Sequence, residues 1–208
     1  MNKLKTIIFW GALWGILEAS LGWVLHLIHF KGEVLLLYPF GLLCMMMAAR
    51  QTGETATIVK VAFVAATVKL INLVMHPAGP VFHVTNPALA IFIEGLVTWG
   101  FCMYAQRKSS RWMLKIPLAI GMVFVSILLF RGWQIFMDAY VSVNPGIHKT
   151  GGTDLLSLWI GRSVIQGAML LGAAQLVEST GQPIHLARWT ARLAVPFLTL
   201  SIVLNSIL

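Results

Sequence analysis

Five charged side chains interrupt apolar stretches of this sequence, where they could bind a polar ligand or pair with one another. In a lipid-facing helix each would cost at least ~2.5 kcal/mol, so such residues face a bundle interior, pair, or line a water-filled cavity. Two asparagines nearby in the sequence add uncharged hydrogen-bonding groups. The charged residues are Glu18, Lys69, Glu94, Arg131 and Arg162, and the asparagines are Asn72 and Asn86.

Hydrophobic composition predicts that membrane helices position these groups. Of 208 residues, 58% are hydrophobic and only 11% are charged. A soluble domain of this size could not bury so much apolar surface. A spanning helix needs roughly 20 apolar residues, which predicts one all-α membrane domain over residues 1–208 with about seven spans, or six if the short second run does not cross. The apolar runs are 6–28, 34–49, 56–75, 86–105, 112–140, 155–177 and 187–208.

The distribution of lysine and arginine predicts the orientation of the bundle. Cytoplasmic segments accumulate these residues during insertion. With a cytoplasmic N-terminus, the inner segments hold Lys3, Lys5, Arg50, Arg107, Lys108, Arg111, Lys115, Arg188 and Arg192, and the outer segments hold Lys31 and Lys149. The same bias explains the net charge of +8 without nucleic-acid binding. We therefore expect a multi-pass protein of the cell membrane, such as the bacterial inner membrane.

This orientation predicts the depth of the buried charges. Glu18 and Glu94 come out near the midplane, whereas Lys69, Arg131 and Arg162 come out in the outer half. One interpretation is that the acids and bases pair and fix helix register. The other is a polar pocket open to the outside. In that pocket three cations against two carboxylates would suit an anionic or carboxylate-bearing ligand.

Five of the six histidines map to the outer side of the predicted bundle. His26 lies at the end of the first run, and His76 and His83 lie between the third and fourth runs, where they could form a lid over the pocket. Interfacial histidines can be ordinary headgroup residues. They can also bind a metal, cobalamin or haem, or donate hydrogen bonds to an organic substrate. The sequence leaves the metal and cofactor open.

Small residues recur along the first run at Gly11, Gly15 and Ala19. Such a stripe lets another helix approach closely. The neighbour could be a helix of the same bundle, or it could belong to a partner membrane subunit.

In its size, basic inner loops, compact helical bundle and small-residue stripe, the chain resembles the substrate-binding S components of energy-coupling factor transporters. The resemblance implies capture of a vitamin, its precursor or a metal ion from the outer face. It also implies that Gly11, Gly15 and Ala19 dock on a transmembrane coupling subunit that works with ATPase subunits. S components usually have six helices, and the metal-specific branch has an N-terminal histidine sequence that this chain lacks.

The expected function is therefore uptake of a small molecule, through an importer or by the chain alone. The sequence contains no GxxxxGK[ST] loop, so any ATP hydrolysis must come from a partner. It also lacks the HExxH and GxSxG motifs, and we expect no enzyme activity. The alternative is a haem- or metal-binding membrane subunit of an electron-transfer complex.

Overall fold

The computed structural model describes residues 2–29, 33–75, 81–107, 112–141, 153–179 and 184–207, and every regular element in these ranges is a helix. Seven are long, and the four-residue α4 continues the direction of α3 after Ile71. The helices are α1 (Lys3–Leu27), α2 (Glu33–Thr52), α3 (Thr57–Leu70), α4 (Asn72–Met75), α5 (Val81–Arg107), α6 (Trp112–Val141), α7 (Thr153–Ser179) and α8 (Ile184–Ile207).

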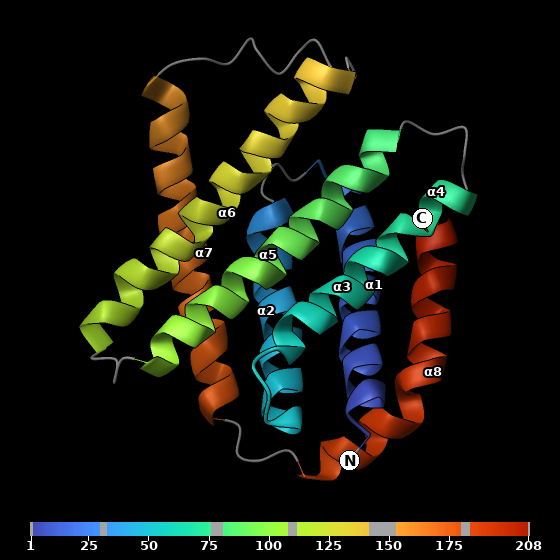
Figure 1. Cartoon of the computed structure of the whole chain (residues 1–208). Helices are drawn as coiled ribbons and strands as arrows, with labels where there is room; N and C mark the ends of the chain where they lie inside the picture. The colour runs from blue at the N-terminus through green and yellow to red at the C-terminus, as the bar shows by residue number, and fades with distance from the viewer. Residues whose placement is uncertain are drawn as a thin grey trace.

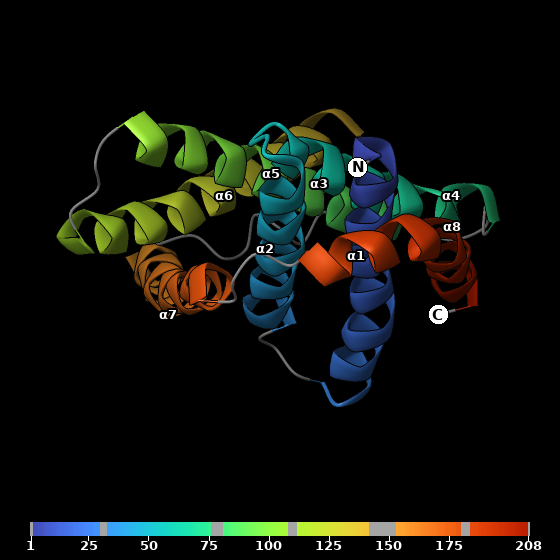
Figure 2. The same cartoon turned by 90° about the horizontal axis from the view of Figure 1, so that it is seen from below.

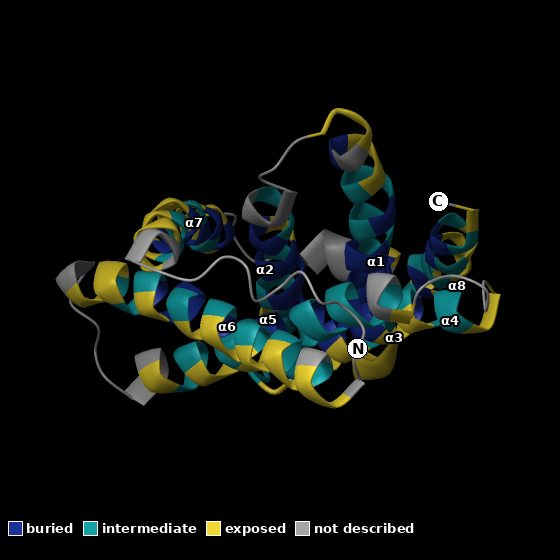
Figure 3. Cartoon of the chain, turned by 90° about the horizontal axis from the view of Figure 1, so that it is seen from above, coloured by how far each residue is buried: buried dark blue, intermediate teal, exposed yellow. Residues whose placement is uncertain are grey.

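The helices form two crossing layers (Figures 1 and 2). One layer consists of α6, α5 and α3, and the other of α7, α2, α1 and α8, with neighbours in each layer in contact. The long helices alternate in direction along the chain, as short connections require (Figure 1). Viewed from above, buried residues concentrate on α1 and α2 between the layers, and exposed residues cover the outward faces of α6 and α7 (Figure 3).

Six of the long helices have the length and hydropathy needed to cross a membrane: α1, α3 with α4, α5, α6, α7 and α8. The chain is therefore an all-α, multi-pass membrane protein, as its composition predicts. The remaining helix, α2, corresponds to the shortest predicted run and contains Glu33 and Arg50. It nevertheless lies inside the bundle, where it contacts α1, α3, α5 and α7.

One helix boundary differs clearly from the sequence prediction. The Asn86–Pro87 pair suggests a helix start, but α5 begins at Val81 and places Pro87 inside the helix. Membrane helices tolerate an internal proline when other groups satisfy the freed backbone. In the first turn of α5, the Thr85 hydroxyl donates a hydrogen bond to the Val81 carbonyl at 3.1 Å. The prediction mistook a proline in the second turn for one in the first.

Two glycines allow large side chains and helices to meet in the core. A Cβ atom at Gly41 of α2 would lie 2.5 Å from the indole ring of Trp14 in α1, and Trp14 is fully buried. A Cβ atom at Gly95 of α5 would collide with the Cβ of Ala62 in α3. The first contact packs α2 against α1, which carries Glu18, and the second packs α5, which carries Glu94, against α3.

Polar contacts join the helices at the end of the bundle where α2 ends and α3 begins. Lys3 forms an ion pair and a hydrogen bond with Glu54, and Lys60 lies 4.0 Å from the same carboxyl group. Lys115 lies 3.8 Å from Glu178, which connects α6 to α7. Lys3 and Lys115 are among the residues that the lysine and arginine distribution assigns to the cytoplasmic end.

Reporter fusions test this orientation. Alkaline phosphatase folds only outside the cytoplasm, because it needs disulfides. We expect high phosphatase activity when it is fused after Ile207 and none when it is fused after Arg107, since α6, α7 and α8 separate the two positions by three crossings. The reverse pattern would show that the N-terminus lies outside.

Acid should weaken the contact between α1 and the α2–α3 turn. The hydrogen bond and charge of Lys3, together with the charge of Lys60, lower the pKa of Glu54. A carboxyl group with a lowered pKa stabilises the fold above its ordinary pKa, and this contribution is lost as pH falls through the lowered value. The wild-type protein should therefore melt at a higher temperature than Glu54→Gln at neutral pH. The difference should shrink below about pH 4.3, the ordinary glutamate pKa. A difference that grows in acid would contradict the assignment.

Candidate functional site

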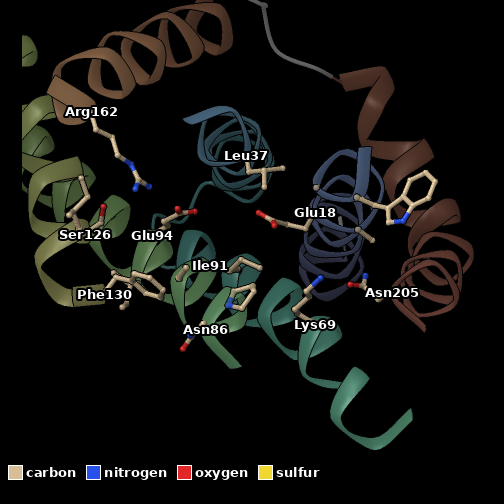
Figure 4. A pocket seen from close by; sticks show the side chains of 17 residues that line it. Glu18, Leu37, Lys69, Asn86, Ile91, Glu94, Ser126, Phe130, Arg162 and Asn205 are labelled. Atoms are coloured by element: carbon tan, nitrogen blue, oxygen red, sulfur yellow. The ribbon is translucent and has the colours of Figure 1, made fainter. Parts of the chain in front are cut away.

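A cavity of about 490 Å³ lies in the half of the bundle opposite the Lys3–Glu54 contact. Figure 4 shows the side chains that line it. All seven long helices contribute residues to its wall. These residues lie in the middle of each helix or at the end away from the Lys3–Glu54 contact. The size falls in the range of roughly 300–1,000 Å³ that small-molecule sites occupy. The lining residues are Glu18, Ala19, Gly22, Trp23, Leu37, Lys69, Asn86, Pro87, Ala90, Ile91, Ile93, Glu94, Ser126, Ile127, Phe130, Arg162 and Asn205.

Glu18 enters the cavity from α1 and is oriented by Trp14, one helical turn earlier. The Trp14 indole donates to the Glu18 carboxylate at 3.3 Å, and Trp14 itself is held against Gly41. Lys69 of α3 attracts the carboxylate electrostatically, but the two side chains form no direct ion pair. The buried Trp14 indole therefore positions Glu18, and Lys69 stays beyond direct contact with it.

Glu94 lies at the middle of α5, and its side chain is 8% exposed. The neighbouring backbone is tied to α2, because the Tyr38 hydroxyl donates to the Glu94 carbonyl at 3.4 Å and lies 3.0 Å from the Thr98 hydroxyl. Arg162 of α7 attracts the Glu94 carboxylate but makes no ion pair with it. The buried Nε of Arg162 has no hydrogen-bond partner among the described residues. This second acid and base also remain apart.

The four charged groups follow one another across the cavity (Figure 4). Arg162 points toward Glu94, Glu94 and Glu18 turn their carboxyl groups toward each other, and Lys69 lies on the far side of Glu18. The two carboxylates are near enough to repel. The centre of the cavity is therefore acidic, and each base lies beyond one of the acids.

Asn205 of α8 is a wall residue that the sequence reading missed. Its amide nitrogen donates to the Gly15 carbonyl at 3.2 Å and to the Ser201 carbonyl at 2.9 Å, which joins α8 to α1. Its Oδ1 is buried and has no hydrogen-bond partner in the part of the chain that the structure describes, and the residue is 3% exposed. An asparagine in the last apolar run was the signal in the sequence that could have indicated it.

The structure places five of the ten predicted pocket residues on the cavity wall: Glu18, Lys69, Asn86, Glu94 and Arg162. Asn86 is held there by Trp133 of α6, whose indole donates to the Asn86 side-chain oxygen at 3.1 Å. This contact also places Trp133 beside the cavity as a positioning residue.

Arg131 and Asn72 are not on the cavity wall, so the structure does not bring these two predicted residues to the cavity. Arg131 donates to the Gln134 side chain on its own helix at 3.3 Å, and Asn72 is the first residue of α4. Without Arg131, the wall holds two acids and two bases, Glu18, Glu94, Lys69 and Arg162. The sequence predicts three cations against two carboxylates and therefore an anionic ligand. The described wall lacks that surplus of positive charge.

The predicted histidine lid falls outside what the structure describes. His76 is outside the described residues, and the side chains of His26 and His83 are likewise not described. Within the described part of the chain, no group of three or more histidine, cysteine, aspartate or glutamate side chains is arranged to hold a metal ion.

The small-residue stripe of α1 packs inside the bundle. A Cβ atom at Gly11 would lie 2.6 Å from the Cβ of Val64 in α3, and one at Gly15 would lie 2.5 Å from the Ser201 hydroxyl in α8. Ala19 is 4% exposed and faces the cavity. Because the chain's own helices cover these residues, the structure favours internal packing over docking to a partner.

Comparisons with protein-family models, curated proteins and solved structures find no match for this chain. The geometry of the cavity is therefore the basis for assigning a function. The fold and the site together define a helical membrane protein with a charged internal cavity.

A double-mutant cycle tests whether Glu94 and Arg162 form a structural pair. Breaking a closed buried ion pair costs ~3–5 kcal/mol, because one charge is left uncompensated. Since these side chains make no direct pair, we expect a coupling below ~1 kcal/mol between Glu94→Gln and Arg162→Gln in the free energy of unfolding of ligand-free protein. A coupling of several kcal/mol would identify a structural ion pair instead.

Proposed function

We propose that this protein captures a small polar molecule from the outer side of the cell membrane and works as the substrate-binding subunit of an importer. The observation that carries the proposal is the pair of open acid–base couples, Glu18 with Lys69 and Glu94 with Arg162, around one cavity. Acidic and basic side chains held apart inside a membrane protein are costly unless something fills the space between them.

The opposite end of the molecule supplies an internal comparison. There Lys3 and Glu54 make direct contact, as do Lys115 and Glu178 at 3.8 Å. In these two pairs the charges that join helices are in direct contact. The couples that stay open are those that line the cavity, which supports a ligand-binding role over a role in helix register.

The packing beyond the cavity supports a role in capture from one side of the membrane. The lining residues come from the middle and one end of each helix, whereas side chains toward the other end, such as Trp10, Met45 and Ile58, are buried in a continuous core. A ligand released inward would need this core to move. A transmembrane coupling subunit driven by ATPase subunits would supply that movement, as in the transporters that the chain resembles.

Mass spectrometry of small molecules that copurify with the protein tests this function. We expect one compound at near-stoichiometric amount in wild-type protein purified from its native membrane. In Glu94→Gln its occupancy should fall at least ~10-fold, because losing one buried charged partner costs about 2–5 kcal/mol. The matched control Glu178→Gln neutralises an exposed glutamate at the other end and should retain the compound. Equal loss in both variants, or no compound in wild type, would refute the proposal.

A further inference from the structure

The order of charges in the cavity defines the chemistry of its ligand, provided that the cavity is the capture site proposed above. Glu18 and Glu94 extend from α1 and α5 and face each other across the centre (Figure 4). Lys69 attracts Glu18, and Arg162 attracts Glu94, each from the side away from the centre. The most negative position in the cavity is therefore the gap between the two carboxylates, where neither base reaches.

We propose that this gap binds a positively charged nitrogen of a small organic molecule. Such a group would contact both carboxylates at once and relieve the repulsion between them. An anion would fit the arrangement poorly. Lys69 and Arg162 lie at opposite ends of the row, and an anion beside either base would also face the carboxylate next to it.

Two buried polar atoms indicate that the ligand has further hydrogen-bonding groups. Among the described residues the Oδ1 of Asn205 accepts no hydrogen bond and the Nε of Arg162 donates none, although both atoms are buried and both residues line the cavity. Buried polar atoms are nearly always paired. A donor on the ligand would satisfy Asn205, and an acceptor would satisfy Arg162.

The rest of the wall accommodates an apolar body. Leu37, Ile91, Ile127 and Phe130 line the cavity around the charged row. An inorganic cation would leave these side chains and the volume of about 490 Å³ unused. The wall therefore fits an organic cation with a hydrophobic portion.

Three similar probes of different charge test the assignment on purified full-length protein freed of copurified ligand. The probes are phenethylammonium, neutral phenethyl alcohol and anionic phenylpropionate, and binding is measured by saturation-transfer NMR and thermal shift. Phenethylammonium should bind at least ~10-fold more tightly than the alcohol, because it alone gains charged contacts with two buried acids. Glu18→Gln and Glu94→Gln should each reduce its affinity at least ~10-fold, and Glu178→Gln should leave it unchanged.

Several outcomes would overturn the cation assignment while leaving the uptake function standing. One is equal affinity for the alcohol. A second is tighter binding of phenylpropionate, lost in Arg162→Gln, which would show that the site prefers an anionic ligand. A third is binding of Mn²⁺ without phenethylammonium, which would identify a metal site. Failure of all three probes to bind, with a copurified compound still present in untreated protein, would also overturn it.

Discussion

A charged side chain in the hydrocarbon core of a membrane has no water to solvate it, so every such residue must turn toward the protein interior. In this chain that constraint acts on α1, α3, α5 and α7 together, because each carries an acid or a base that lines the cavity. Turning all four inward brings their charges to a common space. The cavity is the result, and the apolar faces of the same helices are left for lipid.

The position of Glu18 depends on a residue that lies away from the cavity. Gly41 leaves room for the ring of Trp14, and Trp14 donates a hydrogen bond to Glu18. A larger residue at position 41 would displace the indole, and the carboxylate would lose its only hydrogen bond within the described residues. On the other side of α1, Asn205 bonds to the Gly15 carbonyl. The site is therefore held in place by contacts of α1 with α2 on one side and with α8 on the other.

Much of this arrangement could be predicted from the sequence, because hydropathy and the cost of buried charge are local properties. They located the helices and indicated that Glu18, Lys69, Glu94 and Arg162 share an interior. They could not separate Arg162 from Arg131, since both arginines lie in apolar runs and only the rotation of each helix decides which one faces the cavity. Rotation depends on packing against neighbours, such as the Trp133–Asn86 contact between α6 and α5.

The same limit applies to Asn205 and to the small residues of α1. An asparagine near the end of an apolar run looks interfacial until α8 is placed beside α1. Gly11 and Gly15 predict a close helix neighbour, but the sequence does not say whose helix it is. The three-dimensional arrangement identifies α3 and α8 of the same chain.

The order of the charged helices along the chain has a consequence for biogenesis. Glu18 is synthesised in α1, two helices before Lys69, and Glu94 in α5 is synthesised two helices before Arg162 in α7. Each acid therefore leaves the ribosome before the base that will face it. The insertion machinery must hold α1 and α5 in a hydrated or protonated state until the later helices arrive, so assembly of this bundle is completed only when α7 and α8 join it.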